Sequence, residues 1–205
     1  TTLFRSELTY FRRRIEEEGV CRIFEVSVAL HGDKAKEYEV VVDSTVQEKN
    51  ITFPTDANLL TKIVMRCHTM AKLEDVKLWR SYQREVKKLL RTIRFKSKGR
   101  KQGEAQLAVR RLRTIACILI RDMRRKLSPE ALEIHQQSLD LYDLVQRQKR
   151  SDTGKIYSLH EPNVSCISKG KAHKKYEFGA KASVTVTKTN GIIVEIGRAS
   201  CRERV

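Results

Sequence analysis

Four successive segments with helical hydrophobic spacing lie between two regions of strand character, and this order limits the folds available to the chain. Strand-like runs cover residues 37–46 and 176–188, and the hairpin signal Asn190-Gly191 follows the second run. The helical segments fill the chain between Pro54 and Arg150. The pattern predicts a mixed α+β or α/β fold in which an all-helical insertion interrupts a β-sheet after its first strand.

The insertion has the clearest local signals. Thr55 or Asp56 can cap its first helix, and Ser128-Pro129 predicts the start of its last helix. Apolar side chains at helical spacing are expected to be buried; in the first helix they are Leu59, Leu60, Ile63, Val64, Cys67 and Met70. In the second helix, expected from Glu74, they are Trp79, Tyr82, Val86, Leu89, Leu90 and Ile93. In the third they are Leu112, Ile115, Ala116, Leu119, Ile120 and Met123.

A helical pattern also precedes the first strand, over residues 7–30, and Gly19 is a candidate break in it. The strand that follows contains Val40-Val41-Val42 and then Asp43. The apolar, β-branched run predicts a buried strand. A buried carboxylate needs a hydrogen bond, a cation or a metal ion, so Asp43 is either a turn or capping residue or a catalytic acid.

The charge of the chain favours a polyanionic partner. Its 205 residues have a formal net charge of +17, and residues 87–126 contain fifteen basic and only two acidic side chains. Nucleic acid is favoured over a membrane surface, because no stretch approaches the ~20 apolar residues of a spanning helix. The five cysteines form no paired motif, which predicts neither a zinc site nor a disulfide framework.

Two clusters of bases are candidate DNA-binding sites: a solvated helix face better explains any single base, but the bases are scarcely interleaved with acids, which favours DNA contact for the clusters. The first cluster lies in and after the Gly-punctuated loop at residues 95–103, and the second lies in the loop before the last hairpin. The candidate residues are Lys96, Lys98, Arg100, Lys101, Arg110 and Arg111, with Lys169, Lys171, Lys174 and Lys175.

Three groups of motifs, which stand along the chain in the same order as in the family, resemble those of bacterial insertion-sequence DDE transposases. Residues 42–51 and 53–57 are similar to the first-aspartate segment of that family. Residues 8–15 with Gly19 resemble the helix that precedes this strand. The segment after the helical insertion is represented by residues 158–162, 169–171 and 176–181.

The resemblance implies a partial ribonuclease-H-like core with the helical insertion after its first strand. Asp43 would then be the first catalytic carboxylate and a ligand of Mg²⁺ or Mn²⁺. The implied activity is metal-dependent DNA strand cleavage and strand transfer. The implied partners are double-stranded DNA, at element ends and target, and a second copy of the chain in a homodimer, with no membrane. The implied location is the bacterial cytoplasm, in association with the nucleoid.

The family's second aspartate and final glutamate are expected beyond the Asn190-Gly191 hairpin, so we expect this chain to be a fragment, truncated at both ends and inactive in cleavage. The C-terminal tail, residues 195–205, resembles the translation of a short-read sequencing adapter and is expected to break the strand pattern.

The expected organisation is an N-terminal helical segment (1–36), the first core strand (37–56), the basic helical insertion (57–150), the hairpin part of the core (151–194) and a non-native tail (195–205).

Two further hypotheses remain open from the residues. A non-catalytic basic DNA-binding protein would explain the charge without using Asp43. A helical RNA-binding module would also explain it, but the chain has no aromatic RNA-binding strand motif.

Overall fold

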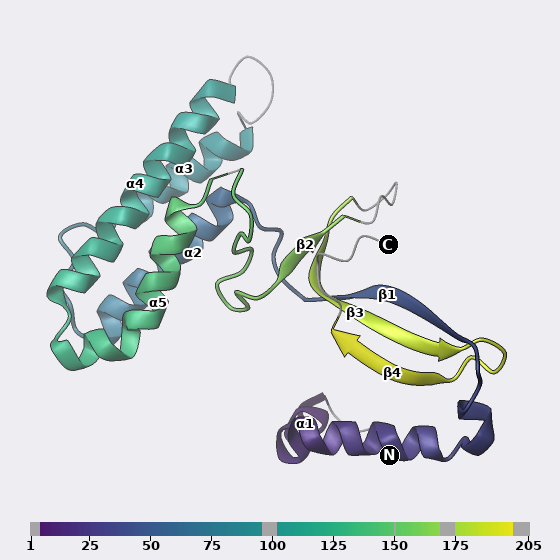
Figure 1. Ribbon diagram of the computed structural model, residues 1–205. Coiled ribbons are helices and arrows are strands. Elements are labelled where there is room, and N and C mark those ends of the chain that lie inside the picture. The colour runs from purple at the N-terminus through teal and green to yellow at the C-terminus, as the bar shows by residue number, and fades with distance from the viewer. Residues whose placement is uncertain (1–4, 96–101, 150, 169–174, 199–205) are drawn as a thin grey trace. The chain divides into compact units, whose positions relative to one another are not determined.

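The computed structural model describes residues 5–95, 102–149, 151–168 and 175–198 (Figure 1). Within these residues the protein is a mixed α+β structure with five α-helices and a four-stranded antiparallel sheet. The elements in chain order are α1 (Arg5–Ala29), η1 (Gly32–Ala35), β1 (Val40–Glu48), α2 (Asp56–Leu73), α3 (Gln83–Phe95), α4 (Gln102–Lys126), α5 (Pro129–Arg147), β2 (Ser165–Ile167), β3 (Glu177–Thr187) and β4 (Ile193–Arg198).

The chain leaves the sheet after β1, forms the four helices α2–α5 and returns to the same sheet. The strand order is β1-β3-β2, and β4 also pairs with β3. The predicted helical insertion after the first strand is therefore confirmed. By compactness the chain divides into one unit of residues 1–47 and 180–205 and a second of residues 48–179, and the second contains all four inserted helices.

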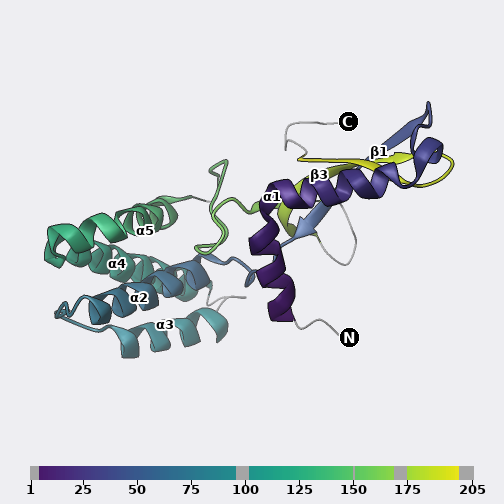
Figure 2. The same ribbon diagram turned by 90° about the horizontal axis from the view of Figure 1, so that it is seen from below.

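The core of the second unit follows the predicted helical spacing. α4 packs against α2, α3 and α5 (Figure 2). The expected buried stripes of α2 and α4 are confirmed in full, and Leu112, Ile115, Leu119 and Ile120 are completely buried. Thr55 accepts a hydrogen bond from the backbone N–H of Asn58, and Ser128 accepts one from Ala131, so both act as N-caps.

The segment before α3 differs from the prediction. Residues 75–82 form a loop, and α3 begins only at Gln83. Asp75 and Tyr82 adopt positive φ values of 49° and 52°, which interrupt a continuous helix. Trp79 is consequently 87% exposed rather than buried, whereas Val86 is buried as expected.

The helix α1 is interrupted at Glu16, with φ 54° and ψ −162°, rather than at Gly19.

The structure also corrects the expected end of the last strand. β4 continues to Arg198 and pairs in register with β3, from Thr185 opposite Glu195 to Ala182 opposite Arg198. The expectation that the strand pattern breaks at Ile196 is therefore wrong, and residues 199–205 of the expected non-native tail lie outside the described residues.

The first strand is exposed, and the prediction of a buried strand is wrong. Val40, Val41, Val42 and Asp43 are all exposed, and only Ser44 and Val46 are half-buried. The valine run gives the strand its β propensity. No other part of the described chain covers these side chains, so the run does not enter the core.

The carboxylate of Glu37 helps to hold the β3–β4 turn. The Glu37 carboxylate accepts hydrogen bonds from the backbone N–H groups of Thr189, at 2.8 Å, and Asn190, at 2.9 Å. These hydrogen bonds, first that from Thr189, lower the pKa of Glu37 below its usual 4.5.

This arrangement predicts an acid-sensitive turn. Because the folded-state pKa of Glu37 lies below the unfolded value, its stabilising contribution is complete above about pH 4.5 and is lost as the pH falls through the folded-state pKa. We expect the amide resonances of Thr189 and Asn190 to shift with an apparent pKa below 4.5. In the Glu37→Gln variant this titration should be absent; an unchanged titration would contradict the assignment.

Candidate nucleic-acid interface

The helix α4 carries an apolar stripe and, beside it, a stripe that contains arginines. Its apolar stripe faces the other helices, and a neighbouring stripe contains Arg110, Arg113 and Arg121. In an α-helix, positions separated by three, four, seven or eleven residues lie on one side. The same periodicity that builds the core therefore places these arginines along one edge of the helix.

Several bases of the insertion are neutralised by acids from other helices. Arg111 Nε lies 2.7 Å from Glu85 Oε1, and Arg124 Nη2 lies 2.8 Å from Asp140 Oδ1 and 2.9 Å from Asp143 Oδ2. The hydrogen bond from Arg111 lowers the pKa of Glu85. A count of acids within residues 87–126 misses these partners, because the acids lie outside that segment and approach it only in the folded chain.

Other bases of α3 and α4 have no acidic partner in the described part of the chain. Among the described residues no acidic side chain pairs with any of these eight: Arg84, Lys87, Lys88, Arg91, Arg94, Arg110, Arg121 and Lys126. A solvated helix face would normally interleave acids and bases. The uncompensated bases therefore make the helical unit attractive to phosphate groups.

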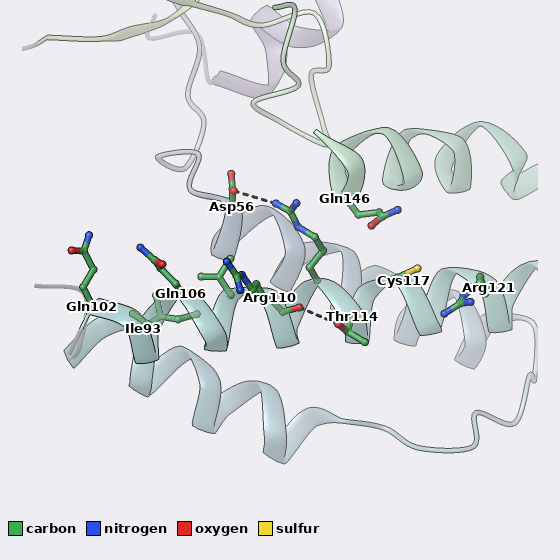
Figure 3. Close-up of a pocket in the computed structure, with 12 residues that line it drawn as sticks. Asp56, Ile93, Gln102, Gln106, Arg110, Thr114, Cys117, Arg121 and Gln146 are labelled. Carbon is green, nitrogen blue, oxygen red and sulfur yellow. Dashed lines mark hydrogen bonds and ion pairs between the residues drawn. The ribbon is translucent and has the colours of Figure 1, made fainter. Parts of the chain in front are cut away.

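A groove of about 860 Å³ runs along the arginine stripe of α4 (Figure 3). Asp56 at the start of α2 and Gln146 near the end of α5 lie on its other side. Arg113 Nη2 lies 3.4 Å from Asp56 Oδ2 across the groove. The lining residues are Asp56, Ile93, Gln102, Ala105, Gln106, Val109, Arg110, Arg113, Thr114, Cys117, Arg121 and Gln146.

Three of the ten predicted DNA-binding residues can be placed. Arg110 is exposed and lines the groove, whereas Arg111 pairs with Glu85 and does not line it. Lys175 lines a separate pocket of about 410 Å³, and its Nζ lies 5.5 Å from the centre of the Tyr176 ring. The other candidates lie outside the described residues: Lys96, Lys98, Arg100, Lys101, Lys169, Lys171 and Lys174.

Asp43 lies on the exposed strand β1, and its Oδ1 accepts a hydrogen bond of 2.7 Å from the backbone N–H of Ser44. Within the described part of the chain, no group of three or more His, Cys, Asp or Glu side chains could hold a metal ion. One exposed carboxylate supplies too few ligands for Mg²⁺ or Mn²⁺. The residues in place therefore do not fit the metal centre that the transposase resemblance implies.

Sequence reasoning missed most of the groove. Arg113 and Arg121 were part of the charge count but were not singled out, Asp56 was considered only as a helix cap, and Gln102 and Gln106 were not considered. The available signal was the polar stripe at three- to four-residue spacing beside the apolar stripe of α4. Asp56 and Gln146 could not be found this way, because they reach the groove from other helices.

Comparison of the chain with protein-family models, with curated proteins and with solved structures gave no match. None of the helices in the described ranges is long and apolar enough to span a membrane. Function is therefore inferred from the residues and their geometry.

Proposed function

We propose that the protein acts on double-stranded DNA as part of a transposase of the bacterial insertion-sequence DDE type, and that its helical insertion binds the DNA backbone. The observation that carries the DNA-binding part is the set of uncompensated bases on α3 and α4, two of which, Arg110 and Arg121, line an open groove. Backbone contacts of this kind position a protein on duplex DNA without selecting a sequence.

The transposase part of the proposal is supported by the order of the elements. The strand with Asp43 is followed by the four helices α2–α5, and the chain then returns to the same sheet through β2 and β3. This is the order that a ribonuclease-H-like core with an insertion after its first strand would have. In this proposal Asp43 is the first acid of the catalytic site.

A second candidate function is non-catalytic binding of DNA. The exposure of Asp43, and the lack of a metal-holding group of side chains in the described residues, favour it. This protein would coat or bridge duplex DNA through the same basic helices.

Substitution of Asp43 separates the two functions. In an enzyme that contains these residues together with its remaining catalytic acids, Asp43→Asn is expected to reduce cleavage of element-end DNA at least about 100-fold, the size of loss that follows removal of one electrostatic contact to a transition state, because the neutral amide is a weaker ligand for Mg²⁺ than the carboxylate. DNA binding should stay nearly unchanged, because the amide has almost the same size as the carboxylate. Asp33→Asn, which removes the same charge from an exposed acid outside the strand, is the control. Cleavage that survives Asp43→Asn would exclude Asp43 from the reaction and favour the non-catalytic function.

A further inference from the structure

The arginines of the α4 groove are of two kinds. Arg110 and Arg121 are exposed, and no acid pairs with either of them among the described residues. Arg113 is half-buried and pairs across the groove with the carboxylate of Asp56. The groove thus holds two arginines available to an anion and a third that already has an anionic partner.

We infer that this groove binds the sugar-phosphate backbone of duplex DNA. Arg110 and Arg121 make the first phosphate contacts, and Asp56 occupies Arg113 until a phosphate displaces it. The inference rests on the proposed DNA-binding function and assigns that function to one surface.

The polar side chains of the groove suit a phosphate backbone. Gln102, Gln106 and Gln146 present amide donors beside the arginines, whereas the Thr114 hydroxyl donates to the backbone carbonyl of Arg110 at 3.1 Å (Figure 3). Arginine and glutamine are among the residues that commonly contact phosphate and sugar oxygens. From Arg110 to Arg121 the helix rises about 16 Å, at about 1.5 Å per residue. That length corresponds to about five base pairs, at about 3.4 Å of rise per phosphate of one strand.

The lining also distinguishes a duplex from a single strand. The described lining residues include no Phe, Tyr, Trp or His, and the apolar ones are Ile93, Ala105 and Val109. Proteins that bind single-stranded DNA or RNA stack the bases on aromatic side chains. A groove with arginines and no aromatic platform therefore matches a paired duplex, whose bases stay stacked on each other.

The Asp56–Arg113 pair is weak enough to be displaced. Its N···O distance is 3.4 Å, and 35% of the Arg113 side chain and 60% of the Asp56 side chain are exposed. Ion pairs with this exposure contribute little, because water and salt screen them. A phosphate, which can accept two hydrogen bonds from one guanidinium group, competes well for Arg113. Removing the charge of Asp56 should therefore strengthen DNA binding.

Variants of the full chain test the assignment by the salt dependence of binding to a 20-base-pair duplex. Each lost phosphate contact reduces the slope of log K against log salt by about 0.9, which weakens binding about eightfold per contact at 0.1 M salt. We expect this effect for Arg110→Gln and for Arg121→Gln. Asp56→Asn should change the slope in the opposite direction. Circular dichroism checks that each variant is folded.

The control is Arg111→Gln, which removes the same charge from the neighbouring residue of α4. Arg111 is held by Glu85 and does not line the groove, so its loss should leave the slope nearly unchanged. If the wild-type chain binds DNA but Arg110→Gln, Arg121→Gln and Arg111→Gln all reduce the slope equally, the groove assignment is overturned and the proposed function stays intact. No binding of duplex DNA by the wild-type chain at low salt would instead overturn the proposed function and the groove together.

A thiol footprint of the wild-type chain tests the same surface without substitution. Cys117 lines the groove and is half-buried, Cys21 is exposed on α1, and Cys67 is buried with its pKa raised to about 12. Duplex DNA should slow alkylation of Cys117 and leave Cys21 reactive, as measured by mass spectrometry of the peptides. Equal alkylation of Cys117 with and without DNA would overturn the assignment, and so would stronger protection by an RNA duplex of the same sequence.

Discussion

Binding of the chain to duplex DNA is expected to weaken by about 10³-fold between 50 mM and 200 mM salt. In a chain with a net charge of +17, we expect about six of the eight uncompensated bases on α3 and α4 to contact phosphates. Six contacts give a slope of about −5 for log K against log salt, because each neutralised phosphate releases condensed counterions. Fluorescence anisotropy with a labelled duplex measures the slope directly.

The salt titration also separates phosphate contacts from recognition of bases. Two unrelated duplexes of equal length should give the same slope and similar affinities, since backbone contacts do not report sequence. Circular dichroism at each salt concentration confirms that the helical content is constant. A flat salt dependence in a folded chain would show that DNA binding does not use these bases.

The helical part of the fold could be predicted because its signals are local. In α4 one apolar residue in every three or four points to the same side, and each of the six predicted positions is buried. Ser128 followed by Pro129 marked the start of α5 because a cap needs only neighbouring residues. These patterns can be read from the sequence because the residues that form them lie within a few positions of one another.

Other features escaped prediction because they depend on the backbone conformation of a loop or on which distant residues cover a side chain. Trp79 and Tyr82 have helical spacing with Val86, but two residues with positive φ place Trp79 in an exposed loop. The valines of β1 fit a buried strand equally well, and only the surrounding chain decides whether they are covered. An apolar run thus predicts a strand more reliably than it predicts burial.

The candidate site likewise has one part that local sequence predicts and one part that depends on residues far apart along the chain. The sequence predicted a basic helical insertion, and Arg110 does line the groove. It could not show that Glu85 neutralises Arg111, or that Asp56 reaches Arg113, because these residues are 26 and 57 positions apart along the chain. The adjacent residues Arg110 and Arg111 therefore have different surroundings, because only Arg111 meets an acid from a neighbouring helix.

The stability of the groove depends on the buried side of α4, and Ile115→Ala is expected to destabilise the helical unit by about 2–5 kcal/mol. Ile115 is completely buried where α4 packs against the other helices, so the substitution loses apolar burial and leaves a cavity. Leu107→Ala is the matched control: Leu107 is on the same helix but 62% exposed, and its loss should cost less than about 0.5 kcal/mol. Urea unfolding followed by circular dichroism measures both.

The same pair of variants links the core to DNA binding. Ile115 and the groove residue Thr114 are consecutive on α4, so the groove exists only while this helix is packed. At a urea concentration that unfolds the Ile115→Ala variant but not the Leu107→Ala control, DNA binding should be lost from the first and retained by the second. Binding that persists after the helical signal has disappeared would show that the bases act as an unstructured polycation. In that case the net charge alone, rather than the placement of Arg110 and Arg121 along a folded groove, would account for the affinity.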